Sequence, residues 1–240
     1  MDPIVCTWTS TLPEGRFTVW PDGCRDLIAV IPNNKPATLL CSGLDSSPRR
    51  LVCRSDTLFV GVRLAAGVSF PWERKQPEYK REDFVLAQNQ ISQFDGWEME
   101  SLCGDAFDEL VSVVDRFASP APVWVPECLE ALRSGRVPRT IPLSERSVRR
   151  KLAETTGAPP SYWRSLARVR QAGLALVQSD APLASIAADF GFSDQPHMSR
   201  EIRRWFGLTP LALRDNREQA IRRLTAPDVF QGPQVRSMMY

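Results

Sequence analysis

The chain has 240 residues, of which 43% are hydrophobic and 24% charged, and its formal net charge is +2 at pH 7. This balance excludes a disordered chain, and no apolar run approaches the roughly 20 residues that a membrane-spanning helix needs. The N-terminus lacks the basic start and apolar core of a signal peptide, so we expect a cytoplasmic protein of two domains with no membrane partner.

The net charge hides a difference between the two halves of the chain. Residues 1–132 hold 12 basic and 19 acidic residues, whereas residues 133–223 hold 17 basic and 8 acidic ones. Only Lys151 among those 17 is a lysine, and arginine can pair bidentately with phosphate or with a guanine edge. The basic half therefore favours a nucleic-acid module, with a solvated basic surface as the alternative.

The N-terminal part reads as short strands separated by turn-forming segments. The expected strands are residues 16–20, 26–31, 37–41 and 57–64. Their spacing predicts an antiparallel β barrel or sandwich. Because β-barrels with a few polar groups commonly hold ligands, we expect a small-molecule pocket near Trp20, Asp22, Cys24 and Arg63.

Cysteine and histidine usage argues against catalysis and against a metal site. The six cysteines include no Cys-x-x-Cys pair, and the chain has one histidine. We therefore predict no metal, no cofactor and no enzymatic activity, since a triad lacks its base and no phosphate-binding glycine loop is present. The cysteines are expected to be mostly buried thiols, and the alternative is a thiol or metal-ion sensor in the N-terminal half.

Residues 104–117 predict an amphipathic helix, followed by a linker that contains Pro120 and Pro122. Its apolar face either packs on the chain's own β-domain or pairs with a second copy of the chain. That face consists of Phe107, Leu110, Val111, Val114 and Phe117.

A basic helix is expected after Ser144, which suits an N-cap, with Val148 and Leu152 facing inward. Its outer face then carries Arg146, Arg149 and Arg150. A long helix over residues 162–178 follows, with Arg164, Arg168 and Arg170 expected on its polar side.

Residues 183–206 predict two helices around a tight turn. The first has apolar residues at i, i+3, i+4 and i+7, Gly191 is expected to end it, and Ser193 to cap the second. The second helix is expected to bury Met198, Ile202 and either Trp205 or Phe206. Its opposite face carries Gln195, His197, Arg200, Arg203 and Arg204. This arrangement is typical of a DNA-binding helix-turn-helix.

The same segment resembles the signature of the AraC/XylS family of transcription regulators. The matching positions are Ile186, Ala187, Gly191, Phe192, Ser193, Arg200, Phe206, Gly207, Thr209 and Pro210. Residues 20–28 and 61–67 also resemble segments of the β-rich sensor domain in one branch of these regulators. The resemblance implies two helix-turn-helix units joined by the long helix, and pairing through a helix between the two domains.

The first unit departs from the family pattern. Pro138 and Pro142 lie where its scaffold helix belongs, so we expect that helix to be truncated. By resemblance the candidate DNA-contacting residues are Arg146, Arg149, Arg150, Ser193, Gln195, His197, Ser199, Arg200, Arg203 and Arg204.

These observations predict an α+β fold of two domains, an antiparallel β barrel or sandwich-like sensor domain with an amphipathic helix and an all-α domain with two helix-turn-helix units. The expected divisions are 1–100 for the sensor, 101–122 for the helix and linker, 123–225 for the DNA-binding domain and 226–240 for a tail. The implied function is a sequence-specific transcription regulator that reads two successive major grooves of double-stranded DNA, with a small-molecule effector, RNA polymerase and a second copy of the chain as further partners. The alternative is a protein-interaction or thiol- or metal-sensing module with a weakened DNA-binding domain.

Overall fold

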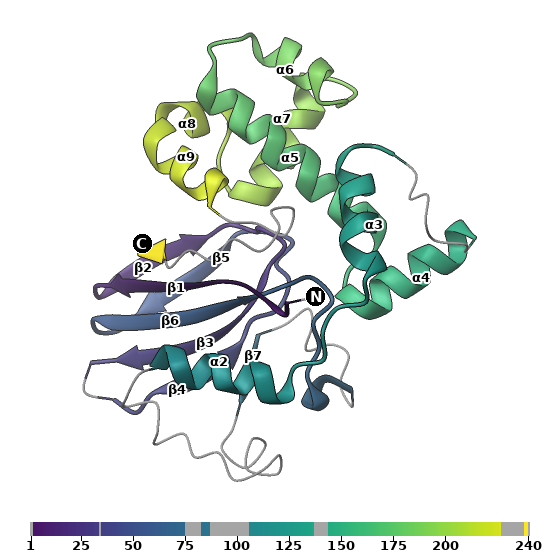
Figure 1. The fold of residues 1–240 in the computed structure, drawn as a ribbon. Coiled ribbons are helices and arrows are strands. Elements are labelled where there is room, and N and C mark those ends of the chain that lie inside the picture. Colours follow the sequence, from purple (N-terminus) through teal and green to yellow (C-terminus); the bar gives the residue numbers. More distant parts are fainter. Residues whose placement is uncertain are drawn as a thin grey trace.

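The structure is a computed structural model that describes residues 2–33, 35–74, 83–86, 106–136, 144–226 and 238–239. It has a sheet domain below and a helical domain above and beside it (Figure 1). The predicted α+β architecture, with strands in the N-terminal part and helices in the C-terminal part, is confirmed. None of the helices in the described ranges has the length and apolar content needed to cross a bilayer.

The sheet domain has eight strands within the described ranges. They are β1 Ile4–Leu12, β2 Gly15–Val19, β3 Arg25–Pro32, β4 Thr38–Cys41, β5 Arg49–Cys53, β6 Thr57–Leu64, β7 Phe84–Leu86 and β8 Met238–Met239. Six form a sheet in the order β7-β4-β3-β6-β1-β8, and β2 pairs with β5 in a separate ribbon. All pairs are antiparallel except β1 with β8. A 3-10 helix, η1, spans Pro71–Arg74.

Helix α2 (Ala106–Phe117) packs against one face of the six-stranded sheet (Figure 1). Leu110 and Val114 are completely buried there, and Phe107, Val111 and Phe117 pack partly buried against the same core. This confirms the interpretation that the helix packs on its own β-domain. The alternative, pairing with a second chain through these five residues, would require the helix to leave the sheet that buries Leu110 and Val114.

The helical domain follows after Ala121. Its helices are α3 Trp124–Arg133, α4 Glu145–Thr156, α5 Pro160–Gln178, α6 Leu183–Asp189, α7 Gln195–Phe206, α8 Pro210–Asp215 and α9 Arg217–Thr225. The central helix α5 buries Trp163, Leu166, Val169 and Leu176 among its neighbours. The predicted long connecting helix is thereby confirmed.

Two side chains of the sheet domain complete the core of the helical domain. Trp20 and Leu44 are each 8% exposed and belong to the same apolar cluster as α5 and α7. The aromatic rings of Trp20 and Phe206 lie 4.9 Å apart between centroids. The two domains therefore meet through a packed apolar contact, in addition to the chain that links them.

Candidate nucleic-acid interface

The second helix-turn-helix consists of α6, a glycine turn and α7. Gly191 in the turn has φ of +68°, a conformation that glycine adopts without steric cost. The N-cap of α7 is Asp194, whose carboxylate accepts a hydrogen bond from the His197 amide at 2.6 Å. The prediction that Ser193 caps this helix was therefore wrong. Asp194, one residue nearer the helix, supplies the side-chain oxygen that accepts the hydrogen bond.

The inner face of α7 is locked onto α5. Met198, Ile202, Trp205 and Phe206 are all at most 1% exposed, so both aromatic residues are buried rather than one of them. The Trp205 indole nitrogen donates to Ser165 Oγ on α5 at 3.2 Å. Packing and this partly buried hydrogen bond together fix the rotation of α7 about its axis, and so decide which side chains face outward.

The outer face of α7 is basic. Gln195, Arg200 and Arg203 are exposed, and neither arginine makes an ion pair within the described residues. Arg204 is exposed as well, but it lies 3.7 Å from Glu201 and its guanidinium stands 5.4 Å from the Trp205 ring centroid. Arg200 and Arg203 are therefore the cations of this helix that are available to an external anion.

His197 and Ser193 are joined to each other at the start of α7. His197 Nδ1 lies 3.0 Å from Ser193 Oγ and accepts from the Ser193 amide at 3.3 Å. Its ring meets that of Phe192 edge to face at 5.4 Å. Since Nδ1 is an acceptor, the proton of the neutral ring sits on Nε2 and is available as a donor. Ser199 is half-buried in the next turn.

The first unit offers α4 as its reading helix. Ser144 Oγ caps it by accepting from the Ser147 amide at 3.3 Å, as predicted, and Leu152 is completely buried. Arg146, Arg149 and Arg150 are all exposed, with Arg150 3.9 Å from Glu154. The truncated scaffold helix was predicted in residues 134–142, and the part of this stretch from residue 137 onward lies outside the described residues.

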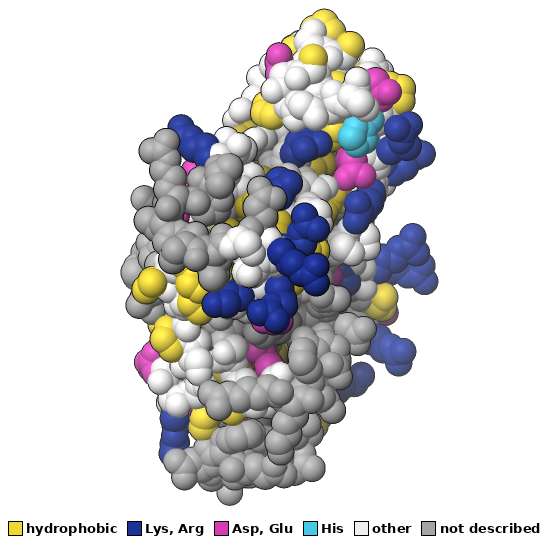
Figure 2. Space-filling view, turned by 90° about the vertical axis from the view of Figure 1, so that its right-hand side faces the viewer, with side chains coloured by type: hydrophobic (Ala, Val, Ile, Leu, Met, Phe, Trp, Pro, Cys, Tyr) yellow, Lys and Arg dark blue, Asp and Glu magenta, His cyan; other side chains and the backbone are white. Residues whose placement is uncertain are grey.

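Basic side chains of the two units gather on one face of the molecule. Figure 2 shows dark-blue side chains on this face, from beside the cyan histidine downward. Arg164 is exposed on α5, and Arg168 stands 5.6 Å from the Phe192 ring centroid. Arg170 corrects the expectation for this helix, because it is 5% exposed and turned toward the sheet domain.

The four residues expected to line an effector pocket lie instead at the junction of the two domains. Trp20 packs on Phe206, and Arg63 pairs with Asp22 at 2.8 Å. The Cys24 amide donates to Asp22 Oδ1 at 2.8 Å. An adjoining cavity of about 10 Å³ has room for no more than one water. The polar groups and rings of these residues are thus occupied by neighbours in the chain, and their role in an effector pocket stays a prediction.

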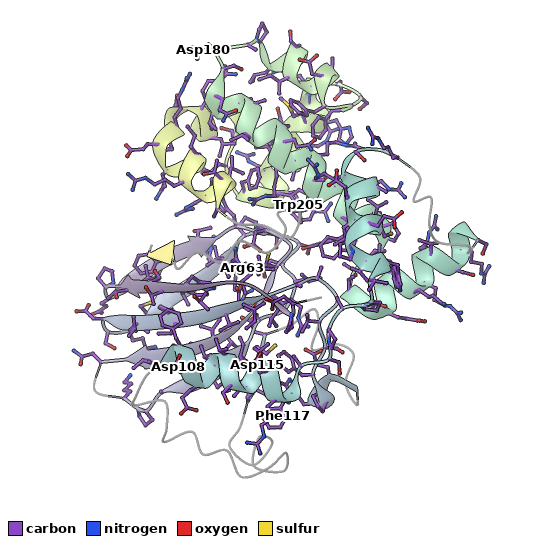
Figure 3. The ribbon with its side chains drawn as sticks, in the orientation of Figure 1. Arg63, Asp108, Asp115, Phe117, Asp180 and Trp205 are labelled. Atoms are coloured by element: carbon purple, nitrogen blue, oxygen red, sulfur yellow. The ribbon has the colours of Figure 1, made fainter. Side chains whose placement is uncertain are left out.

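Arg63 is the most strongly held charge of this junction. It also contacts Asp26, with Nε 3.0 Å from Oδ1. Burial alone would lower the pKa of Arg63, but the carboxylates of Asp22 and Asp26 outweigh that cost and raise its pKa well above the usual value. Figure 3 places Arg63 among the strands and Trp205 in the helices above them.

The cysteines within the described ranges do not have the properties of redox sensors. Each of the five that the structure describes is buried: Cys6, Cys24, Cys41, Cys53 and Cys128. Burial raises the pKa of Cys41 to about 11, although Arg25 lies beside it, and burial also raises the pKa of Cys6. A reactive thiol needs a lowered pKa and access to solvent. These sites therefore favour the prediction of buried, unreactive thiols over a thiol sensor.

Sequence reasoning missed the residues that join the domains. Arg170 was expected on a polar surface, yet it donates to the Pro21 carbonyl at 3.4 Å and to the Leu224 carbonyl at 2.9 Å. Tyr162 donates through its hydroxyl to the Asp45 carbonyl at 2.8 Å. The charge of Arg170 favoured a place on the polar side of the helix, and nothing in the sequence says which turns of the sheet domain Arg170 and Tyr162 meet.

Comparisons with known proteins agree with this geometry in the helical domain. A family model described as a helix-turn-helix domain matches residues 139–216. The HTH-type transcriptional activator RhaS of Escherichia fergusonii is 34% identical over 79 residues, which are 33% of this chain and 28% of that protein. RhaS of Pectobacterium carotovorum is 33% identical over 85 residues, covering 35% and 30%.

These matches thus span less than a third of either curated relative. Among solved structures, ToxT from Vibrio cholerae aligns over 92% of this chain and 98% of its own, with 12% identity and a TM-score of 0.42. That overall similarity is too low to carry over a ligand or a mode of assembly. The match in sequence over residues 139–216 shows that the C-terminal part of this chain contains a helix-turn-helix domain.

Proposed function

We propose that the protein is a sequence-specific DNA-binding transcription regulator whose helical domain reads two successive major grooves. The observation that carries the proposal is the outer face of α7, where Arg200 and Arg203 are exposed and unpaired within the described residues while the inner face is locked. A helix held in one rotation with donors on its outer face is what base readout requires.

The roles of the reading residues follow from their chemistry and place. Gln195 at the start of α7 suits adenine, and Arg200 one turn later suits guanine. Ser193 and the first amides of α7 suit a phosphate, which fixes the position of the helix on the duplex. His197 and Ser199 supply further donors between them, and Arg203 and Arg204 extend the basic face toward the backbone.

The first unit contributes Arg146, Arg149 and Arg150 on α4. Two units on one domain would enter grooves about 34 Å apart on the same side of the duplex. An arginine-only face suits guanine or phosphate contact, so we propose that this unit adds affinity and a less detailed readout than the second.

We further propose the division into a sensor of residues 1–100, a helix and linker of 101–122, a DNA-binding domain of 123–225 and a tail of 226–240. The acidic sheet domain contacts both helix-turn-helix units and is placed to control them. A small-molecule effector, RNA polymerase and a second copy of the chain are the partners that suit a regulator of this design. Because such a regulator binds DNA, we propose that the protein acts in the cytoplasm of a bacterium.

Selection of bound sites from a random DNA pool tests the proposal. A regulator enriches one motif with two recognisable parts, and its affinity falls steeply between low and high salt because phosphate contacts release counterions. Enrichment of no sequence, with affinity independent of salt, would overturn DNA reading and favour a protein-interaction module.

A further inference from the structure

A line of hydrogen bonds and ion pairs runs through the sheet domain toward the helices. It begins at Trp8 on β1, whose indole nitrogen donates to Asp26 Oδ1 at 3.0 Å. The same oxygen of Asp26 accepts from Arg63 Nε at 3.0 Å, and Arg63 Nη2 reaches Asp22 Oδ2 at 2.8 Å. Three adjacent strands, β1, β6 and β3, and the turn before β3 are thereby joined through charged groups.

The helical domain contacts the same turn, residues 20–22, from the other side. Arg170 on α5 donates to the carbonyl of Pro21, the residue next to Asp22, and also to the carbonyl of Leu224 at the end of α9. Trp20 is held between Phe206, at 4.9 Å between ring centroids, and the Arg223 guanidinium, 4.9 Å above its ring. Residues 20–22 thus touch α5, the end of α7 and α9 together.

Trp8, the first residue of this line of hydrogen bonds and ion pairs, is partly exposed. Trp8 and Gly61 face each other across β1 and β6, and a Cβ on Gly61 would lie 2.2 Å from the Trp8 ring. The neighbours of Gly61, Val60 and Val62, point into the core shared with α2. Since side chains alternate along a strand, Trp8 covers the opposite face of the sheet, where it is only half-buried.

The sheet domain does not cover the reading residues. Arg149 on α4 and Arg200 and Arg203 on α7 are exposed with both domains in place. The sheet domain meets the first unit at a separate point, where a Cβ on Gly67 would lie 3.2 Å from Thr155 Cγ2 at the end of α4. A movement of residues 20–22 relative to Gly67 would therefore change the position of α7 relative to α4.

We propose that residues 20–22 are a coupling segment through which the Trp8 face of the sheet sets the orientation of the second helix-turn-helix relative to the first. Control acts on the spacing and angle of the two reading helices and not on their access to DNA. This rests on the proposed DNA-binding function for its purpose, but the coupling itself is a property of the protein alone. Partly buried charges are suited to such a role, because losing one partner leaves the next without compensation.

Fluorine NMR of the full-length chain labelled with 5-fluorotryptophan tests the coupling without DNA. The chain has seven tryptophans, and the spectrum of Trp20→Phe assigns the Trp20 signal. Trp8→Phe removes the indole donor to Asp26 but touches no residue of the helical domain, and Asp22→Asn breaks the Arg63 pair with little change of volume. Both variants are expected to shift the Trp20 signal.

Trp72→Phe is the matched control, since Trp72 is a buried tryptophan of the same domain that stacks on Phe70 at 4.5 Å in the α2-side core. It should leave the Trp20 signal in place. If Trp8→Phe disrupts folding, the Trp20 signal of the Asp22→Asn variant alone tests the coupling. A folded Asp22→Asn variant with an unmoved Trp20 signal, or an equal shift in Trp72→Phe, overturns the proposal.

A second measurement uses DNA duplexes in which the distance between the two parts of the selected motif is varied. The native chain should prefer one spacing, and Trp8→Phe and Asp22→Asn should change the ratio of affinities for native and altered spacing by about tenfold, a usual size for coupling between sites. An unchanged ratio contradicts control by orientation. If the native chain binds no duplex, the proposed function fails, while the fluorine spectra still decide whether the coupling exists.

Discussion

The outward-facing helices of the two helix-turn-helix units, α7 and α4, differ in how firmly their caps and buried side chains hold them. The reading helix of the second unit, α7, has a carboxylate cap at 2.6 Å and four large side chains at most 1% exposed on its inner face. The reading helix of the first unit, α4, has a hydroxyl cap at 3.3 Å and one completely buried residue, Leu152. A helix anchored at many points holds its outer side chains in one place, so we predict that the second unit distinguishes bases better and that the first is more adaptable.

The largest effect is expected where the second unit is anchored most strongly. Trp205→Ala removes a completely buried indole and its hydrogen bond to Ser165, and should cost about 3–5 kcal/mol of unfolding free energy. Denaturant unfolding measures it. Leu152→Ala is the matched change in the first unit, and because it deletes fewer atoms and no hydrogen bond its cost should be smaller; the reverse order would contradict the comparison.

The two units should also differ in how their arginines act on DNA. Arg200→Ala should weaken binding to the selected site by about 1–3 kcal/mol and relax the preference at one base position. Arg149→Ala should weaken binding to all sequences more evenly, with a smaller salt slope, if α4 contacts phosphates. Titrations on the selected site and on singly altered sites measure both, and equal loss of specificity in the two variants would remove the distinction.

The helix caps offer a smaller and more local comparison. Asp194→Ala should destabilise by about 1–2 kcal/mol and Ser144→Ala by about 0.5–1 kcal/mol, because a charged acceptor at a shorter distance contributes more. Thermal unfolding of each variant gives the difference. Asp194→Asn and Ser144→Thr keep a capping oxygen and should recover most of the loss; failure of both to do so would show that the caps are not the cause.

The smallest effect belongs to the helix that leads into the first unit. A hydrogen bond from Arg133 lowers the pKa of Glu130, so the pair stabilises the fold above the unfolded pKa of about 4.3, and this contribution is lost as the pH falls through the lower folded value. Both side chains are largely exposed, which limits the contribution to about 1 kcal/mol or less. Glu130→Gln should therefore reduce the free energy of unfolding at pH 7, and the difference from the native chain should disappear as the pH falls below the lowered folded pKa of Glu130.

The parts of the fold that could be predicted are those governed by local sequence. The alternation of residues 26–31 and 57–64 anticipated β3 and β6, and the helical periodicity near Ile186 and Met198 anticipated α6 and α7. The strands β1 and β5 were not predicted. Ile4–Leu12 contains isoleucine, valine, tryptophan and three threonines, all of which favour strands, so the local sequence did carry a signal for β1 that was missed. Arg49–Cys53 begins with two arginines, and its strand conformation comes from pairing with β2, which the local sequence does not specify.

The same reasoning explains what could be said of the candidate site. The exposed arginines of α4 and α7 followed from the inward spacing of Leu152, Met198 and Ile202, and their exposure agrees with it. The contact between the domains at Trp20, Asp22, Cys24 and Arg63 was not predicted, because a cluster of polar and aromatic residues near a turn suits a ligand pocket and a domain contact equally. Only the position of Phe206, 186 residues further along the chain than Trp20, separates the two interpretations.

Trp20 and Leu44 have a consequence for how such proteins diversify. These two side chains complete the core of the helical domain. A chimaera that fuses residues 123–225 to a different sensory domain would therefore contain a hydrophobic cavity, unless that domain supplies an aromatic and an aliphatic side chain at the positions of Trp20 and Leu44. Exchange of domains between regulators of this design is therefore constrained by packing at the interface between the domains as well as by what each domain recognises.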